Sequence, residues 1–360
     1  MTNFNFKFLG AWLVIVASIT GLQAQNDFTL KGKDEMVPAG VWNDVNGEYI
    51  NAHGGGILLF DSKYYWFGEH RPAKGFSTEV GVTCYSSTDL CNWRYEGVAL
   101  SVSEEAGNEI EKGCIMERPK VIYNKRTKKF VMWFHLELKG KGYEAARAGV
   151  AVSDSPTGPY RFVSSSRVCP GIFPLNMTEE ERDMQWNMEQ FEEWWTPEWR
   201  EAVNKGLFVK RDLEGGQMSR DMTLYVDDDG IAYHIYSSEE NLTLQIAELT
   251  DDYQGHSGKY VRLFPGGHNE APAIFKKDGT YWMITSGCTG WDPNVAELAV
   301  ADSIMGQWTT IGNPCTGPDA DKTFYAQSTY VQQVYGKGNA YIAMFDRWKK
   351  KNLEDSRYVW

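Results

Sequence analysis

The sequence predicts an all-β protein, a five-bladed β-propeller with a helical insertion between blades two and three. Two observations carry this prediction. A polar residue followed by a short apolar strand, a turn and an aromatic strand recurs five times along the chain. The repeats begin 64, 104, 49 and 57 residues apart. Units of three or four strands at such spacings are typical of propeller blades, and the interval of 104 indicates an insertion.

Each of the five repeats opens on a polar residue. They are His53 (HGGGILLFDSKYYWFGE), Glu117 (ERPKVIYNKRTKKFVMWFHLE), Asp221 (DMTLYVDDDGIAYHIYSS), Glu270 (EAPAIFKKDGTYWMITSG) and Gln327 (QSTYVQQVYGKGNAYIAMFDRW). In the fourth repeat, Asp278-Gly279 is a tight-turn dipeptide, and Pro272 lies at the start of the strand because proline cannot donate to a ladder. The first four repeats are each followed by a third strand and a turn. This supports one domain of five blades.

The long interval between the second and third repeats contains a segment of different composition. It covers about residues 171–212 and includes MTEEERDMQWNMEQFEEWWTPEWREAVNKG, which is acidic, aromatic and typical of helices. Pro197 favours a helix that begins there. The insertion could be a lid over the site or a peripheral patch.

The N-terminus has the pattern of a secretory signal peptide, predicted to be residues 1–24. Lys7 precedes an apolar run, and small residues lead to Ala24. Residues 25–360 then form the propeller domain, and the protein is expected to be secreted or periplasmic. No later segment is long and apolar enough to span a bilayer.

Composition and charge narrow the possible partners. The formal net charge is -12, which argues against a nucleic acid or an anionic membrane as the partner. The chain has 14 Trp and 19 Tyr; core packing explains most of these aromatic residues, and others can stack on sugars. The six cysteines show no zinc-ligand spacing. We expect a monomer.

In a propeller the innermost strands surround a central axis, so the residues that open them face one end of that axis. His53, Glu117, Asp221, Glu270 and Gln327 are therefore predicted to converge on one funnel, and three of the five are acidic. Such a funnel can bind a central cation or a column of water. It can also provide two carboxyl groups for glycosidic cleavage.

At these residues the sequence resembles glycoside hydrolase family 43. The motifs most similar to the exo-β-1,3-galactanase branch are NAHGGGI, YYWFGE, CYSSTDL, ERPKVIYN, SRDMTLYVDDDG, NEAPAIFKKDGTYWM, TGWDPN, QSTYV and DRW, and the resemblance covers about residues 37–360. It implies a five-bladed propeller that cleaves glycosides with inversion, with no required cofactor. A structural cation such as calcium near the axis is a further expectation.

The resemblance also implies roles for four residues. Glu270 matches the general acid, Asp221 the aspartate that orients the acid and tunes its pKa, and Glu117 a carboxylate of the galactanase branch. Most of the larger family places an aspartate base in blade one, where this chain has NAHGGG. In the galactanase branch the handling of water falls to the residue that matches Gln327, with Glu117 as a possible helper. A carboxylate at Asp221 should raise the pKa of Glu270 by like-charge repulsion.

Four more residues are candidates for substrate contact. Glu69, Trp291 and Asp292 end strands or loops on the same face, which favours hydrogen bonding to sugar hydroxyls and stacking on a sugar ring. Equally, Glu69 could cap a turn and Trp291 could pack in the core. His53 could bind water or an ion at the axis, or it could be a satisfied interior histidine.

The leading functional hypothesis is an exported, exo-acting, inverting hydrolase of β-1,3-galactan or arabinogalactan-type glycan. One alternative is an α-L-arabinofuranosidase or β-xylosidase of the same family. The other is a catalytically inactive propeller that only binds glycan, because the usual base is missing from blade one.

Overall fold

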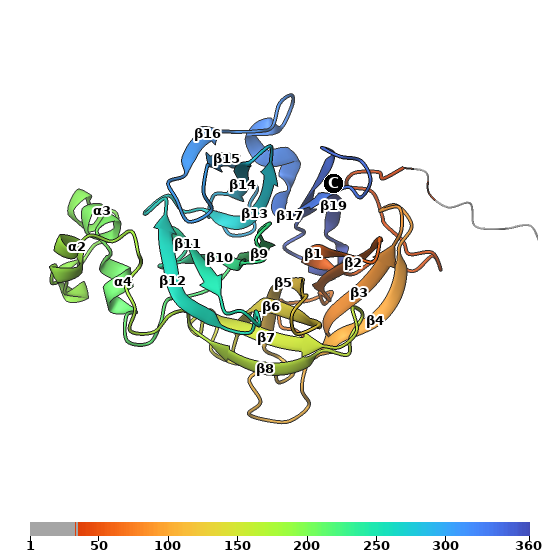
Figure 1. Ribbon diagram of the computed structural model, residues 1–360, viewed down its shortest axis with the longest axis horizontal. Helices are drawn as coiled ribbons and strands as arrows, with labels where there is room; N and C mark the ends of the chain where they lie inside the picture. Colours follow the sequence, from red (N-terminus) through yellow and green to blue (C-terminus); the bar gives the residue numbers. More distant parts are fainter. Residues whose placement is uncertain (1–32, 34) are drawn as a thin grey trace, which may run out of the picture.

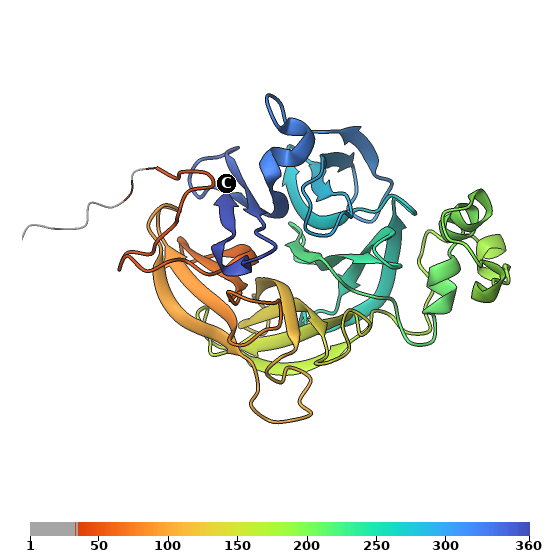
Figure 2. The same ribbon diagram turned by 180° about the vertical axis from the view of Figure 1, so that it is seen from behind.

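Five separate antiparallel sheets surround one axis, which confirms the predicted five-bladed propeller (Figure 1 and, from behind, Figure 2). The structure, a computed structural model, describes residue 33 and residues 35–360. The predicted signal peptide, residues 1–24, lies outside the described residues. No helix among the described residues is long and apolar enough to cross a membrane.

Each blade is a meander in which consecutive strands pair. Blade one contains β1 (His53–Phe60), β2 (Lys63–Glu69), β3 (Gly81–Ser87) and β4 (Arg94–Ser101). Blade two contains β5 (Ile115–Asn124), β6 (Lys129–Glu137), β7 (Arg147–Ser153) and β8 (Arg161–Ser166). Blade three contains β9 (Met222–Val226), β10 (Ala232–Ser238), β11 (Thr243–Leu249) and β12 (His256–Leu263).

The last two blades differ in size. Blade four contains β13 (Glu270–Lys277), β14 (Thr280–Ser286), β15 (Ala296–Ala301) and β16 (Thr309–Gly312). Blade five has only β17 (Gln327–Gln333), β18 (Tyr341–Arg347) and β19 (Arg357–Val359). Two 3₁₀ turns, η2 (Ala320–Tyr325) and η3 (Leu353–Asp355), flank blade five strands. The first strand of each blade lies next to those of its two neighbours, so β1, β5, β9, β13 and β17 surround the axis.

A repeated bulge points the opening residues at the axis. The strand register shifts directly after His53, Glu117 and Glu270. The residue that follows each of them has a left-handed backbone: φ is 58° at Gly54, 55° at Arg118 and 50° at Ala271. A bulge redirects a side chain and interrupts pairing, which explains how one sequence pattern turns polar groups toward the same end of three blades.

The ring closes through aromatic packing between the two ends of the described chain. The Ala39 amide donates to the Tyr358 carbonyl across 2.7 Å, and the Trp42 ring lies 4.9 Å from that of Trp360. The Tyr358 hydroxyl donates to the Ile50 carbonyl at 2.8 Å. A strand-like segment before β1 thus packs on three-stranded blade five.

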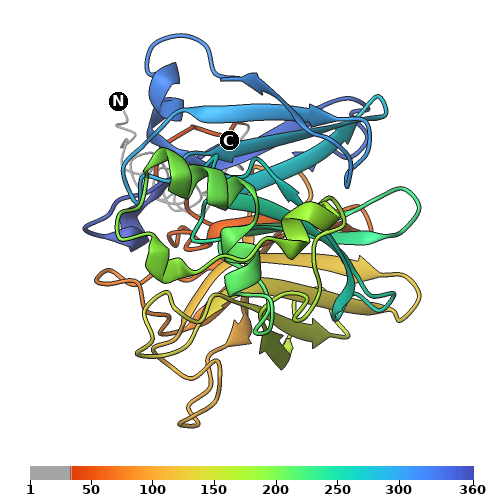
Figure 3. The same cartoon turned by 90° about the vertical axis from the view of Figure 1, so that its left-hand side faces the viewer.

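The insertion between β8 and β9 is helical, as predicted. It contains α2 (Glu179–Asp183), η1 (Met188–Gln190), α3 (Pro197–Asn204) and α4 (Leu207–Arg211). Thr196 caps α3, and Pro197 occupies its first turn, where no amide hydrogen is needed. The helices lie against the outer side of blade three (Figure 1), and Figure 3 shows them in front of it. Their apolar side chains form a separate cluster of buried residues: Trp199, Ala202, Val203, Leu207 and Phe208, with Leu242 from blade three.

Candidate active site

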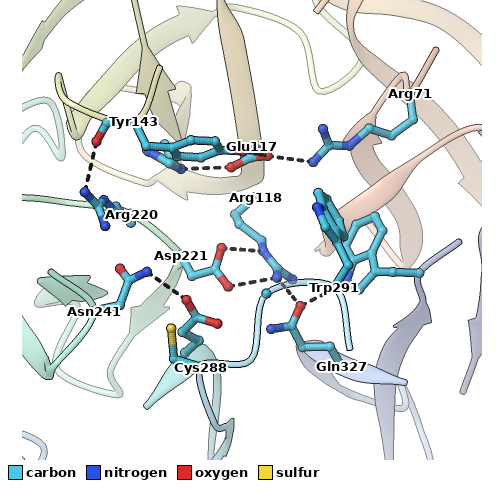
Figure 4. A pocket seen from close by; sticks show the side chains of 14 residues that line it. Arg71, Glu117, Arg118, Tyr143, Arg220, Asp221, Asn241, Cys288, Trp291 and Gln327 are labelled. Atoms are coloured by element: carbon cyan, nitrogen blue, oxygen red, sulfur yellow. Dashed lines mark hydrogen bonds and ion pairs between the residues drawn. The ribbon is translucent and has the colours of Figure 1, made fainter. Parts of the chain in front are cut away.

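A pocket of about 280 Å³ lies at the end of the axis where the innermost strands begin. All five blades contribute to it (Figure 4). It is lined by Arg71, Glu117, Arg118, His135, Tyr143, Arg220, Asp221, Asn241, Glu270, Cys288, Gly290, Trp291, Gln327 and Trp348. The four residues that the sequence predicted to be catalytic therefore share one cavity, together with Trp291.

Glu270, the first residue of β13, is a half-buried carboxyl with few donors around it. Asn241 Nδ2 donates to its Oε1 at 2.8 Å, and the Cys288 thiol lies beside it. Burial, and secondly the negative charge of Asp221, raise the pKa of Glu270 to about 8. The sequence had predicted the effect of Asp221, but burial is the larger cause. A carboxyl with such a pKa is protonated at neutral pH and can donate a proton.

Arg118 is the cation at the centre of the pocket. Its Nε and Nη2 donate to the two carboxylate oxygens of Asp221 at 2.9 and 2.8 Å. Its Nη2 also donates to Gln327 Oε1 at 2.6 Å, and its Nη1 to the Ser328 carbonyl at 3.3 Å. One guanidinium therefore fixes side chains from blades three and five (Figure 4).

Glu117 is held as a carboxylate. Its Oε1 accepts from Arg71 Nη2 at 2.9 Å and from the Tyr143 hydroxyl at 3.0 Å, and its Oε2 lies 3.1 Å from His135 Nδ1. Burial works to raise its pKa, but Arg71 and His135 outweigh it and hold the pKa well below the usual range. Burial likewise works to lower the pKa of His135, but hydrogen bonds to Glu117 and Glu137 raise it to about 9. Glu117 thus stays ionised.

The Gln327 amide is fixed in one orientation. Its Oε1 accepts from Arg118 and from Trp348 Nε1, the latter at 2.9 Å, and its Nε2 donates to Ser286 Oγ at 2.9 Å. A carbonyl oxygen has two lone pairs, and both are occupied here. Glu117, in contrast, accepts three hydrogen bonds with about four lone-pair sites.

Glu69 and His53 do not line the pocket. Glu69 is 2% exposed; its Oε1 accepts from the Arg118 amide at 2.7 Å, and its Oε2 pairs with Arg71. It therefore supports two pocket residues from beneath. His53 is fully buried, with its Nδ1 3.2 Å from Asp346 and its ring stacked on Tyr358.

Trp291 and Asp292 lie at the border between the pocket and a second cavity. Trp291 lines both, and its ring centroid is 5.5 Å from that of Trp348. Asp292 lines only the second cavity, of about 330 Å³, together with Tyr325 and Arg347.

Several pocket residues were not predicted from the sequence. Arg118 and Trp348 belong to motifs already noted, ERPKVIYN and DRW, and Arg118 directly follows Glu117, so the sequence did carry a signal for both. Arg71, Tyr143 and Asn241 come from loops and turns, where no periodic pattern marks them. Arg71 and Asn241 contact carboxyl groups of the next blade, Glu117 and Glu270, whereas Tyr143 contacts Glu117 within blade two.

The space between β1, β5 and β17 beneath the pocket contains the buried side chain of Lys120. Its Nζ donates to the carbonyls of Gly54 at 3.0 Å and Arg118 at 3.3 Å. A Cβ atom at Gly56 would lie 2.6 Å from Lys120 Cδ, so any other residue there would displace the Lys120 side chain. Within the described residues no group of three or more His, Cys, Asp or Glu is arranged to hold a metal. A structural cation stays a prediction.

Replacing Lys120 by methionine should change how stability depends on pH. Burial lowers the pKa of Lys120 to about 7. The unfolded chain then binds more protons than the folded one between about pH 7 and 10, so this group makes stability rise with pH in that window. The free energy of unfolding of each protein is measured in urea at pH 7 and at pH 9. The difference, wild type minus Lys120→Met, should be larger at pH 9, by at most about 1.4 kcal/mol per pH unit. An equal difference at both pH values would contradict this.

Comparisons with known proteins agree with this geometry. The family model described as Glycosyl hydrolases family 43 matches residues 181–350. The β-1,3-galactosidase BT3683, solved with galactodeoxynojirimycin, is 69% identical with a TM-score of 0.89, covering 90% of this chain and 94% of that one. A search among curated proteins found no match.

Two further solved structures are more distant. The exo-β-1,3-galactanase 1,3Gal43A from Clostridium thermocellum is 35% identical over 90% of this chain, with a TM-score of 0.72. The exo-β-1,3-galactanase Pc1,3Gal43A from Phanerochaete chrysosporium, solved with galactose, is 32% identical over 91% of this chain, with a TM-score of 0.70. This chain covers 62% and 64% of their lengths. With its propeller, its pocket of carboxyl groups and a relative of 69% identity over nearly the whole of both chains, the protein belongs to glycoside hydrolase family 43.

Proposed function

We propose that this glycoside hydrolase removes single galactose units from the non-reducing ends of β-1,3-linked galactan, with inversion at the anomeric carbon. The observation that carries the proposal is the pairing in one pocket of a protonated carboxyl, Glu270, with an ionised one, Glu117. The substrate class is supported by the β-1,3-galactosidase and exo-β-1,3-galactanase activities of the three similar proteins.

Glu270 acts as the general acid. Cleavage passes through an oxocarbenium-like state, and the departing oxygen must receive a proton. Asp221 keeps negative charge near Glu270, and Arg118 holds Asp221 in place through two hydrogen bonds. Inversion requires a water molecule on the opposite face of the sugar ring, and Glu117 and Gln327 are the groups that handle this water.

Glu117 and Gln327 have different free atoms for contact with the attacking water. Both lone pairs of Gln327 Oε1 are taken by Arg118 and Trp348, so this oxygen has none left for a proton of water. Glu117 keeps spare acceptor capacity on Oε2, although its low pKa makes it a weak base. One hydrogen of Gln327 Nε2 goes to Ser286 Oγ, which leaves the second to donate to the water and position it, while Glu117 assists in accepting the proton of the water.

The activity should decline at alkaline pH. Glu270 must be protonated to act, and its pKa is about 8, so kcat/KM should fall about tenfold per pH unit above that value. Asp221→Asn removes a negative charge that raises this pKa, so the alkaline limb should move to lower pH. A pH profile of kcat/KM on β-1,3-galactobiose measures both effects. An alkaline limb that stays in place in Asp221→Asn would exclude Asp221 as the group that tunes the acid.

A substrate panel tests the proposed function. The release of reducing sugar from β-1,3-galactan, arabinan and xylan should be fastest from β-1,3-galactan, with galactose as the product. Preference for arabinan or xylan would instead support an arabinofuranosidase or xylosidase. Binding of galactan without release of sugar would support a propeller that only binds glycan.

Export and the monomeric state remain part of the proposal. A polymeric substrate fits an enzyme that meets glycan outside the cytoplasm, and residues 1–24 have the pattern of a signal peptide. Mass spectrometry of the protein recovered from the periplasm or the medium should find an N-terminus near residue 25. Light scattering should give the mass of one chain.

A further inference from the structure

The turn between β10 and β11 has an unfavourable backbone that must be held in place by its surroundings. Three consecutive residues have left-handed φ angles: 52° at Glu239, 58° at Glu240 and 63° at Asn241. None is glycine, so each is in a conformation that L-residues rarely adopt. Such conformations persist only where neighbouring structure over-determines them.

A buried ion pair fixes the first residue of this turn to the helical insertion. Glu239 is fully buried, and its two carboxylate oxygens accept from Arg262 Nε and Nη2, both at 2.7 Å. The same guanidinium donates to the Val203 carbonyl at 2.9 Å and the Asn204 carbonyl at 3.0 Å, at the end of α3. Arg262 thereby joins the last carbonyls of α3 to the turn.

Two more contacts connect the turn to the insertion. Glu240 pairs with Arg211, the last residue of α4, at 2.8 Å, and with Arg220 at 3.1 Å. Leu242, which follows the turn, is 1% exposed and packs inside the apolar cluster of the insertion beside Trp199. Residues on both sides of Asn241 are therefore anchored to α3 and α4.

Asn241 itself points into the pocket (Figure 4). Its Nδ2 donates to Glu270 Oε1 at 2.8 Å. An amide nitrogen can only donate, so Oε1 is the acceptor of this hydrogen bond, which favours Oε2 as the oxygen that carries the proton of a neutral Glu270. Asn241 is thus placed to leave Oε2 free for the proton.

From these contacts we propose that the helical insertion is a brace for the acid: it holds the turn of residues 239–242 so that Asn241 fixes the proton of Glu270 on Oε2. Leu242, Glu239 and Glu240 are positioning residues that act through Asn241. The insertion is then neither a lid nor a peripheral patch, the two roles that its composition allowed. This inference rests on the proposed function, in which Glu270 is the acid.

The dependence of rate on the leaving group tests the brace. A natural disaccharide needs the acid, whereas an aryl β-galactoside with an acidic phenol leaves with little protonation. Leu242→Ala should lower kcat/KM for β-1,3-galactobiose by about 10- to 100-fold and for the aryl galactoside by no more than about threefold. The matched control is Leu224→Ala, since Leu224 is a buried leucine of the same blade in a different apolar cluster. It should leave unchanged the ratio of kcat/KM for β-1,3-galactobiose to kcat/KM for the aryl galactoside.

A double-mutant cycle shows whether Leu242 acts through Asn241. Asn241→Ala should reduce the ratio at least as much as Leu242→Ala, and adding Leu242→Ala to Asn241→Ala should change it no further. Leu242→Met, which restores most of the volume, should recover the wild-type ratio. Glu240→Ala removes two ion pairs without opening the core, so it tests the brace even if Leu242→Ala does not fold; it should shift the ratio in the same direction.

Failure of the brace can be distinguished from failure of the proposed function. A wild type that cleaves neither galactoside would refute the proposed function alone. In that case the crystal structure of Leu242→Ala still decides: the inference expects Asn241 Nδ2 to lie beyond roughly 3.5 Å from Glu270 Oε1. Two results would contradict the proposal that the insertion positions Asn241. One is an unchanged distance between Asn241 Nδ2 and Glu270 Oε1 in Leu242→Ala. The other is an equal loss of kcat/KM on the disaccharide and the aryl galactoside in both Leu242→Ala and Glu240→Ala.

Discussion

Glu270→Gln is expected to lower the rate of hydrolysis of β-1,3-galactobiose by about 10²- to 10⁴-fold, or about 3–5 kcal/mol in the barrier. The amide keeps the shape of the carboxyl and an acceptor for Asn241 Nδ2, but it has no acidic proton to give. Substrate binding should therefore survive. Steady-state kinetics should show the loss in kcat.

The leaving group separates loss of the acid from general damage to the pocket. Glu270→Gln should keep far more activity on an aryl galactoside with an acidic phenol than on the disaccharide. Gln327→Ala is the comparison variant: it should slow both substrates alike, because each needs the attacking water, and azide as an external nucleophile should restore part of the rate. If Glu270→Gln slows both substrates equally, Glu270 is not the acid.

Arg118→Met is expected to have the largest effect on stability, about 3–5 kcal/mol in the free energy of unfolding. The Asp221 side chain is 16% exposed and would lose both hydrogen bonds that compensate its charge. Gln327 would also lose one of the two donors to its Oε1, so activity on both galactosides should fall. Urea denaturation followed by tryptophan fluorescence measures the loss of stability.

The matched control for this variant is a surface ion pair. Arg126 pairs with Asp251 at 3.2 Å, but their side chains are 62% and 88% exposed. Arg126→Met should therefore cost no more than about 1 kcal/mol, since water screens the exposed pair. If Arg118→Met were as mild as Arg126→Met, the cation at the centre of the pocket would not organise it.

The fold could be predicted because the pattern that specifies it is local. Each blade contains its own alternation of strand and turn, and three of the five predicted opening residues, His53, Glu270 and Gln327, are the first residues of their strands. The helix that was expected at Pro197 begins there because its cap and first-turn proline are adjacent in sequence. The convergence of Glu117, Asp221, Glu270 and Gln327 follows from the ring itself.

The partners of these residues could not be predicted in the same way. Arg118 reaches Asp221 and Gln327, which are 103 and 209 positions away in the chain. Whether Glu69 faces sugar or lies beneath Arg118 depends on a bulge that only the paired strands define. The role of the insertion likewise depends on Arg262, whose contacts with α3 and Glu239 have no local sequence signal.

The most direct test of the proposed function is a proton NMR time course of β-1,3-galactotriose with the wild-type enzyme. An exo-acting, inverting enzyme predicts galactose and galactobiose as the first products, with the new galactose appearing as the α-anomer before mutarotation. The β-anomer would indicate retention, in which a carboxylate attacks the sugar, and would contradict the roles of Glu270 and Glu117. No release of galactose would contradict the proposed substrate.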